Sequence, residues 1–403
     1  MMSTAGQDNA GNGIRANRFL LGALTAGHMV NDWVGGTIWI IAPAIAVSLG
    51  LGPSEIGLIL TINGIAAGVT YIPAGIISDR ISNQGFLMLI TFWWVAAGYF
   101  AATIVPGFWP ITLLLAFGVM GDAFWHPVAT GSLVKTMPGR RAQVLGIHAM
   151  GGSLGGEILG PVSAGFLLGY FSWQTSLQIL VIPAIVMGVV FIPVSRRLAR
   201  TTGKGISRQG LVELFQSWCT PAGIGLVLMM VFYNMSLFAI MAMTPLTLQH
   251  SYDFTPFLGS VVFAGMLVFG TLCQPFIGQF SDKVGRKKLI ITFTTCAALS
   301  AVVAGLTQEL GVFLGALIGS AALLTAVRPI VLAAAVDFSS KSESTTLGLV
   351  FAILDGVGAL GALLAGYAGE LKLGMAFVLA GILALISVVS AALIRFPEHK
   401  RSH

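Results

Sequence analysis

Long apolar runs separated by short polar gaps recur along the whole chain. Each run holds about twenty residues or more, which is enough to cross a hydrocarbon core ~30 Å thick. The runs are continuous and do not alternate with polar residues, so they predict spanning helices and not barrel strands. We place twelve spans at 19–49, 53–78, 85–105, 109–137, 142–169, 173–195, 219–248, 255–280, 289–306, 309–337, 345–371 and 373–396.

The composition supports this interpretation. Hydrophobic residues make up 56% of the 403 residues, and charged residues only 9%. Soluble domains carry roughly 25% charged residues, so this chain has too few to cover a surface that faces water. We therefore expect an all-α, multi-pass protein in the lipid bilayer of the cell inner (plasma) membrane. The net charge of +6 is interpreted as a topology signal, and no nucleic-acid partner is expected.

A basic segment divides the spans into two groups of six. This segment, 196–218, is the longest polar stretch after the first span, and we interpret it as a cytoplasmic linker. It separates a predicted N-terminal six-helix bundle, 19–195, from a C-terminal one, 219–396. The polar ends, 1–18 and 397–403, are predicted to be cytoplasmic tails, the first of them disordered.

The basic residues also predict the orientation. With the N-terminus in the cytoplasm, 19 of the 21 Lys and Arg residues fall in cytoplasmic segments. Lys372 is predicted to lie outside, and Arg328 lies within a span. A wrong number of spans would mix the two sides, so the asymmetry favours both twelve spans and cytoplasmic termini.

The two halves repeat at an offset of about 202 residues. The segment Gly75–Arg80 matches Gly278–Lys283, and a proline precedes each copy at positions 73 and 275. Further matches in the same order join Asn31 to Asn234, Pro43 to Pro245, His126-Pro127 to Arg328-Pro329, and Leu145-Gly146 to Leu347-Gly348. Such a repeat predicts a central site between pseudo-symmetric halves, near the middle of the membrane.

The repeated Gly-x-x-Ser-Asp segments resemble the loop signature of the major facilitator superfamily. Gly27–Asp32, Phe124–Pro127 and the glycine-rich fifth span are similar to its fosmidomycin-resistance-type branch. Gly156–Gly165 is similar to the signature of drug/proton antiporters in the same helix. One departure is that the span 4 arginine of many such antiporters has no counterpart here, where Asp122 and His126 stand instead.

The resemblance implies alternating access, in which two helical bundles rock around a central cavity. It also implies a gate formed by charged residues at the cytoplasmic ends of the spans. The alternative interpretation is that these charges only set the topology. The predicted gate residues are Asp79, Arg80, Asp282, Lys283 and Arg286.

Ionisable residues inside the spans are rare, and they predict proton coupling. A charge at the bilayer centre costs at least about 2.5–3.5 kcal/mol, so such residues usually face a cavity or a partner. For Asp32, Asp122 and His126 the alternative is a buried polar clamp that only fixes helix packing. For Glu157 it is a bond to a neighbouring helix. His28 and His148 are interpreted as packing or gate residues. The predicted proton-coupling residues are Asp32, Asp122, His126 and Glu157.

Arg328 and Asp355 are predicted to lie at nearly the same depth on neighbouring spans. They form either a structural ion pair or a site in which Arg328 receives an anionic substrate group. Further cavity-lining residues are expected to bind a partly apolar substrate, although the aromatic ones can also be packing between helices. The predicted substrate-binding residues are Asn31, Trp39, Trp125, Tyr233, Asn234, Arg328 and Asp355.

These patterns favour a secondary active transporter that works with a small-molecule substrate and protons. Export by a proton-coupled antiporter is favoured, and import of a small organic carboxylate or phosphonate bound by Arg328 is the first alternative. The methionines of span 7 leave copper uptake as a third possibility, and a membrane sensor that transports nothing is a fourth. We expect a functional monomer that is not an enzyme, with no cofactor and no bound metal, because no nucleotide-binding loop or CxxC pair is present.

Overall fold

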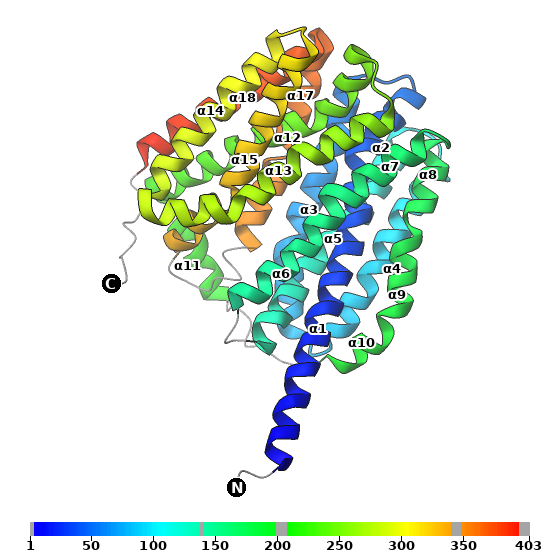
Figure 1. Ribbon diagram of the computed structural model, residues 1–403, viewed down its shortest axis with the longest axis vertical. Coiled ribbons are helices and arrows are strands. Elements are labelled where there is room, and N and C mark those ends of the chain that lie inside the picture. Colours follow the sequence, from blue (N-terminus) through cyan, green and yellow to red (C-terminus); the bar gives the residue numbers. More distant parts are fainter. Residues whose placement is uncertain (1–3, 138–140, 199–207, 340–347, 395–403) are drawn as a thin grey trace.

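The computed structural model describes residues 4–137, 141–198, 208–339 and 348–394, and all regular elements within these ranges are helices (Figure 1). The helices gather into two bundles that lie side by side. The predicted all-helical membrane fold is therefore confirmed. The tail 397–403 and the basic residues of 199–207 lie outside the described ranges.

The N-terminal bundle contains the elements α1 to α10, and its first, fifth and sixth spans are each built from more than one helical element. The first span is α1 plus α2, with a break at Thr37, and the sixth is α8 to α10. The bounds are α1 (Thr4–Gly36), α2 (Ile38–Ser48), α3 (Pro53–Arg80), α4 (Gln84–Ala102), α5 (Phe108–Thr136), α6 (Arg141–Ser153), η2 (Leu154–Leu159), α7 (Gly160–Leu168), α8 (Trp173–Leu180), α9 (Ile182–Val190) and α10 (Ile192–Arg197).

The C-terminal bundle contains the elements α12 to α18, and the short helix α11 precedes it within the predicted linker. Its fifth span contains a π-helical turn, η3, as does the fifth span of the first bundle, η2. The bounds are α11 (Arg208–Trp218), α12 (Pro221–Tyr252), α13 (Pro256–Val284), α14 (Arg286–Leu306), α15 (Leu310–Ser339), η3 (Ala352–Val357), α17 (Leu360–Leu371) and α18 (Leu373–Leu393).

Eleven helical segments in the described ranges are long and apolar enough to cross a membrane. They match eleven of the predicted spans. The remaining predicted span, 142–169, is helical as α6, η2 and α7 but is not among the eleven. Its many glycines and its polar residues make it less apolar than its neighbours.

The glycines of that fifth span allow it to pack directly on the backbone of α1. A Cβ atom on Gly155 would lie 2.0 Å from the Met29 carbonyl oxygen, and one on Gly151 would lie 2.4 Å from that of Thr25. Small residues at helix interfaces permit such close approach inside a bilayer. The contact holds one wall of the central site against α1.

The beginning of the chain differs from the prediction. The sequence predicts a disordered tail over 1–18, whereas α1 is helical from Thr4 onward and extends beyond the bundle (Figure 1). A helix that has already formed in the first span can grow outward, because each added residue gains a local hydrogen bond without needing a tertiary contact.

Helix boundaries follow ordinary local chemistry. Pro53, Pro221 and Pro256 stand in the first turns of α3, α12 and α13, where a missing N–H costs nothing. The hydroxyl oxygens of Thr220 and Thr255 accept hydrogen bonds from backbone N–H groups of the turns that follow them. These caps satisfy N–H groups that would otherwise be unpaired at the helix ends.

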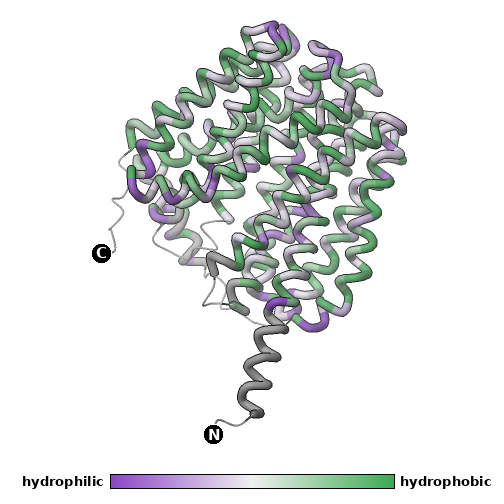
Figure 2. Tube along the Cα trace, viewed as in Figure 1, coloured by the Kyte–Doolittle hydropathy of each residue, from purple (hydrophilic) through white to green (hydrophobic). Residues whose placement is uncertain are grey.

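The outer surfaces of the bundles are apolar along the middle of the spans. Figure 2 shows hydrophilic residues concentrated near the ends of helices, while hydrophobic residues fill their middles. Large apolar side chains are exposed along the spans, which suits contact with lipid and not with water. Examples are Phe100, Phe117, Phe166, Val189, Leu272, Phe276, Val303 and Ile382.

The two bundles touch each other closely at one end. Ser54 on α3 donates its backbone N–H and its hydroxyl to Glu370 on α17, at 3.0 and 2.8 Å. Thr61 donates to the Ala359 carbonyl oxygen at 2.7 Å. On the other side of the cavity α7 packs against α13, where a Cβ atom on Gly165 would lie 2.2 Å from Ser260 Oγ.

Several glycines of α3 lie along this contact. A Cβ atom on Gly57, Gly64 or Gly68 would lie within 2.7 Å of an atom in the C-terminal bundle. Gly75 is nearer the opposite end of the same helix, and no heavy atom lies within 4 Å of the place a Cβ would take there. The bundles therefore meet near α2 and α7 and are apart near α6 and α11 (Figure 1).

Candidate functional site

A cavity of about 440 Å³ lies between the two bundles. Its walls come from α1, α2, α3, α5, α6 and η2 on one side, and from α12, α13, α15 and η3 on the other. The lining combines aromatic side chains with several ionisable ones. This is the mixture of apolar surface and few polar groups that is typical of small-molecule sites.

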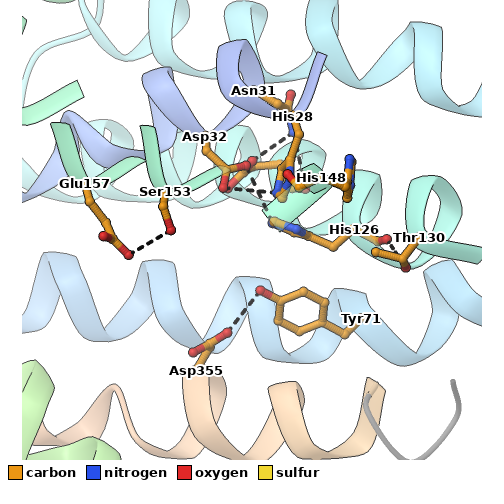
Figure 3. A network of polar contacts seen from close by, with 11 residues as sticks. His28, Asn31, Asp32, Tyr71, His126, Thr130, His148, Ser153, Glu157 and Asp355 are labelled. Atoms are coloured by element: carbon orange, nitrogen blue, oxygen red, sulfur yellow. Dashed lines mark hydrogen bonds and ion pairs between the residues drawn. The ribbon is translucent and has the colours of Figure 1, made fainter. Parts of the chain in front are cut away.

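A cluster of histidines and a carboxylate forms one wall of the cavity (Figure 3). His28 Nδ1 lies 2.8 Å from the backbone carbonyl oxygen of His148. A carbonyl oxygen only accepts hydrogen bonds, so Nδ1 carries the hydrogen and donates it. The other ring nitrogen, His28 Nε2, lies 3.2 Å from Asp32 Oδ2, and His126 Nε2 lies 3.8 Å from Asp32 Oδ1.

Asp122 extends this cluster. Asn31 Nδ2 donates to Asp122 Oδ1 at 2.8 Å, and the carboxyl groups of Asp122 and Asp32 lie close enough to interact. The cluster therefore joins two carboxyl groups and two imidazoles in one connected network, to which the structure adds His28.

Gly152 on α6 makes room for the cluster. A Cβ atom at this position would lie 2.6 Å from His28 Cε1 and 2.7 Å from Asp32 Oδ2. Gly35 has the same role beside Asp122, because a Cβ there would lie 2.9 Å from Asp122 Oδ2. The absence of side chains at these two positions allows the charged groups to approach one another.

Arg328 and Asp355 form an ion pair on the C-terminal side of the cavity, as one of the two sequence interpretations predicts. Arg328 Nη2 lies 3.2 Å from Asp355 Oδ1, and both residues line the cavity. The Tyr71 hydroxyl, on α3 of the other bundle, donates to Asp355 Oδ2 at 3.2 Å (Figure 3). Asp355 thus accepts hydrogen bonds from both halves of the molecule.

Glu157 lies on η2 in the cavity wall. Ser153 donates to Glu157 Oε1 at 3.3 Å, and Thr271 on α13 donates to Oε2 at 2.8 Å. The second bond crosses from one bundle to the other. The prediction left a bond to a neighbouring helix open for Glu157, and this bond is present.

The predicted substrate-binding residues divide into two groups. Trp39, Arg328 and Asp355 line the cavity. The other four are buried within the bundles and are not among the residues that line this cavity, so a role for them in substrate binding stays a prediction. These four residues are Asn31, Trp125, Tyr233 and Asn234.

The latter residues pair within their own bundles. The Trp125 ring packs against Phe92 and Phe191, with ring centroids 5.1 and 5.7 Å apart. Tyr233 donates its hydroxyl to the Leu324 carbonyl, and Asn234 donates to the Leu354 carbonyl at 2.5 Å. Polar groups in a bilayer need such internal partners, so these side chains point into helix packing.

The methionines of span 7 contribute little to the cavity. Met229, Met230, Met235 and Met243 are buried in the packing of the C-terminal bundle. Met241 lines the cavity. The thioethers that raise the possibility of copper uptake therefore do not face the cavity together.

Of the predicted gate residues, three have described side chains. Arg80 and Lys283 are exposed, and Arg286 pairs with Asp337 within the C-terminal bundle. The side chains of Asp79 and Asp282 lie outside the described part of the structure. The gate therefore stays a prediction.

Several residues of the site were not predicted from the sequence. Tyr71, Ser153 and Thr271 form hydrogen bonds to the buried carboxyl groups, and Gln274 lines the cavity beside them. A neutral hydroxyl or amide in an apolar run costs little, so it gives no signal of its own. Tyr71 and Thr271 both lie on the second span of their halves, but at the offset that joins Gly75 to Gly278 the counterpart of Tyr71 is Gln274.

A family model described as Major Facilitator Superfamily matches the chain twice, over residues 24–269 and 224–403. The chain belongs to the major facilitator superfamily. The two matches overlap over residues 224–269 and together cover nearly all the described residues. The protein is therefore a multi-pass membrane transporter of the major facilitator type, which acts on small-molecule substrates.

Two named transporters are similar to this chain in sequence. The "Probable 4-methylmuconolactone transporter" of Cupriavidus pinatubonensis is 24% identical over 337 residues, which cover 79% of this chain and 76% of the relative. The hexuronate transporter of Bacillus subtilis is 28% identical over 155 residues, 38% of this chain and 36% of the relative. The second match thus spans about a third of its relative's length.

Solved structures share the fold. A bacterial homologue of the human lysosomal transporter Spinster matches with TM-scores of 0.78 and 0.71 in its inward-facing occupied and unoccupied forms, at 16% and 17% identity. Each match covers 93% of this chain, and it covers 96% and 94% of the other chain, respectively. A mutant of the nucleoside transporter NupG matches with a TM-score of 0.72 at 17% identity, covering 93% of this chain and 98% of NupG.

Proposed function

We propose that the protein moves a small organic anion across the inner membrane by alternating access, with protons as the coupling ion. The observation that carries this proposal is the position of Arg328. It is the one Lys or Arg among the residues that line the cavity in the described structure. A guanidinium group offers two parallel donors that match a carboxylate or phosphonate.

The rest of the cavity suits a partly apolar anion. Trp39, Phe238 and Phe351 also line the cavity and provide aromatic surface. The volume of about 440 Å³ falls within the usual range of small-molecule sites, roughly 300–1,000 Å³. The name of the hexuronate transporter denotes an organic anion, and that of the other relative denotes a lactone. Both support a substrate of this class.

Asp355 competes with the anion for the guanidinium group of Arg328. In the absence of substrate it occupies one side of the guanidinium group of Arg328, while Tyr71 holds its second oxygen. A substrate carboxylate that binds Arg328 displaces Asp355 from it. The Tyr71 hydroxyl then continues to hold Asp355, so the pair can reform after the substrate leaves.

Proton coupling is assigned to Asp32, Asp122 and His126. The contact between two carboxyl groups, beside imidazoles in the cavity wall, supports this assignment. Carboxyl groups that share a site exchange protons as a unit, and imidazole is the side chain best matched to neutral pH. Protonation of the cluster changes the charge of the cavity that the anion enters.

The conformation described here corresponds, in this proposal, to a state open to the cytoplasm. The bundles meet at the end where Ser54 contacts Glu370, and the charge asymmetry predicts that this end is outside. The Spinster homologue that matches well is inward-facing in both of its structures. Asp79, Arg80, Asp282, Lys283 and Arg286 then form a cytoplasmic gate that closes in the opposite state.

A second candidate function is the export of a small organic compound in exchange for protons. Glu157 supports it, because this carboxyl group lies in the antiporter-like segment of span 5 and also lines the cavity. In that case Glu157, together with Asp32 and Asp122, carries the protons. The two candidates predict opposite relative directions of proton and substrate flow.

Transport in proteoliposomes with an imposed pH gradient tests the proposal. Radiolabelled aromatic and lactone carboxylates, sugar acids and cationic drugs are compared as substrates. We expect uptake of an organic anion that follows the proton gradient and is lost in Arg328→Gln. Flux that ignores the gradient would refute proton coupling, and normal anion transport by Arg328→Gln would refute the binding role of Arg328.

A further inference from the structure

We propose that His28, Asp32 and His126 form a binding site for one divalent transition-metal ion of the zinc class, in the wall of the cavity. One ligand atom from each residue lies within 4.8 Å of the others. A tetrahedral zinc ion, with bonds of about 2.0–2.2 Å, holds its ligand atoms roughly 3.3–3.6 Å apart. The measured contacts of 3.2 and 3.8 Å to the two Asp32 oxygens bracket this spacing.

His28 is already oriented as a ligand. Its Nδ1–H donates to the His148 carbonyl oxygen, which leaves the lone pair of Nε2 directed toward Asp32 when the ring is neutral. Histidine ligands in metal sites commonly donate their second nitrogen to a carbonyl or carboxylate in this way. The His148 ring also stacks on His28, with centroids 4.2 Å apart, and restrains the ring further.

The ligand atoms lack other partners. His28 is only 6% exposed, and its Nε2 atom has no hydrogen-bond partner among the described residues. Asp32 Oδ1 is likewise buried and has no hydrogen-bond partner among the described residues. Buried polar atoms are nearly always satisfied in native proteins, so both atoms retain unused capacity to bind an ion.

The local charge fits a dication. Asp32 and Asp122 are in contact, so two carboxylates here would repel each other strongly unless a cation lies beside them. A divalent ion balances both charges at once. Imidazole and carboxylate ligands favour zinc-class divalent ions, whereas Cu(I) prefers the thioethers that are buried elsewhere in span 7.

The coordination sphere is open on one side. His28, Asp32 and His126 all line the cavity, so a fourth ligand would reach the ion from there. Three protein ligands with one open position are the arrangement of zinc sites that exchange their fourth ligand. Water or the carboxylate of a bound substrate fits this position.

Metal and protons would then compete for the same ligand atoms. Metal ligands must be deprotonated, so a bound ion excludes the protons that the proposed transport cycle uses. We therefore expect zinc to inhibit transport driven by a pH gradient. This consequence rests on the proposed function, whereas the binding site itself does not.

Titration with Co²⁺ tests the site on the purified, tag-free, chelator-treated protein. We expect one Co²⁺ per chain with the intense visible spectrum of four-coordinate cobalt, which Zn²⁺ abolishes by displacement. His28→Gln and His126→Gln should each weaken binding by about tenfold or more. His250→Gln is the matched control, because His250 is exposed near the end of α12 and far along the chain from the cluster.

Several outcomes would overturn the inference. They are a spectrum of six-coordinate cobalt only, a stoichiometry that falls equally in His250→Gln, or binding that survives both cluster variants. If His28→Gln fails to fold, His126→Gln decides the question, because this ring is partly exposed to the cavity and its loss creates less strain.

The binding test and the transport test fail separately. Failure of the wild-type protein to bind Co²⁺, together with intact pH-driven transport, would refute the metal site alone. One bound Co²⁺ together with flux that ignores the pH gradient would refute proton coupling alone. Zinc inhibition that persists in His28→Gln, a ligand to which no proton-coupling role is assigned, would place the inhibitory ion elsewhere.

Discussion

Glu157 and Asp355 occupy equivalent places in the two halves of the molecule. Each is the fourth residue of a six-residue π-helical turn, η2 or η3, and each accepts a hydrogen bond from a hydroxyl group of the opposite half. The donors are Thr271 for Glu157 and Tyr71 for Asp355, and they lie 200 residues apart in the sequence. The two carboxyl–hydroxyl bonds thus join corresponding spans of the two halves, the fifth of one to the second of the other, although the residue pairs are offset by 198 and 200. π-Helical turns occur often at functional sites, and here they present an acid across the interface.

Removing these two hydroxyl groups should destabilise the described conformation independently. We expect Tyr71→Phe and Thr271→Val each to lower its free energy of unfolding by about 1–3 kcal/mol. The two bonds share no partner, so the double variant should show the sum of both effects. Thermal unfolding in detergent measures this, with Tyr367→Phe as the control for an exposed tyrosine. A strong deviation from additivity would contradict the independence of the two bonds.

Variants of Arg328 and Asp355 separate stability from substrate binding. Arg328→Gln leaves Asp355 without its cation, which should destabilise the protein by about 3–5 kcal/mol. Adding Asp355→Asn removes the uncompensated charge, so the double variant should recover stability but not anion binding. Unfolding curves and substrate binding are measured on the same samples. Recovery of binding in the double variant would show that Arg328 is not the anion receptor.

Asp32→Asn should uncouple transport from the pH gradient. An asparagine keeps the size of the side chain but cannot take up a proton or bear the charge that His28 and His126 face. Exchange of substrate at equal concentrations should persist, while accumulation driven by protons should be lost. Counterflow and gradient-driven uptake in proteoliposomes distinguish the two activities. Unchanged accumulation in Asp32→Asn would exclude this residue from coupling.

Gly152→Ala should disrupt the cluster without altering any charged residue. The new methyl group would lie within 2.7 Å of both His28 and Asp32, which forces them apart. We expect a loss of pH-driven uptake similar to that of Asp32→Asn. Gly315→Ala on α15 is the control, because no heavy atom lies within 4 Å of its added Cβ, and alanine favours a helix over glycine by up to about 1 kcal/mol. Equal activity in both variants would contradict the predicted clash.

Trp39 and Trp125 should respond differently to substitution. Trp39 lines the cavity, so Trp39→Ala should raise the KM for an aromatic anion. Trp125 packs inside the N-terminal bundle, so Trp125→Phe should lower stability and leave KM unchanged. Transport kinetics and thermal unfolding together provide the comparison. A higher KM for Trp125→Phe would show that the cavity extends farther into that bundle in another state.

The fold could be predicted from the sequence because its signals are strong and repeated. Apolar runs must be helical in lipid, and the basic residues that separate them have a preferred side. Asp32, Asp122 and Arg328 were found because a charge within an apolar run is costly and needs a reason. The helical start of α1 was missed, since no tertiary signal marks a helix that extends beyond a bundle.

The details of the site could not be predicted because the sequence of an apolar span does not indicate which face of its helix meets the cavity. A helix that is apolar all round has no polar face to indicate which side meets the cavity. Trp125, Tyr233 and Asn234 were therefore placed in the cavity, although they pack within the bundles. The hydroxyl groups of Tyr71 and Thr271 were overlooked for the related reason that neutral groups cost little in an apolar run.

The glycines of α3 have a consequence for the shapes that this protein can adopt. Gly57, Gly64 and Gly68 are needed for the contact that exists, but Gly75 has empty space beside it and would tolerate alanine in the described state. Gly348, at the start of the facing span, is equally unconstrained. In the proposed alternating-access cycle, Gly75 and Gly348 allow these two backbones to approach each other when the cytoplasmic side closes. Alanine at either position should therefore leave the described conformation intact and hinder the closed one.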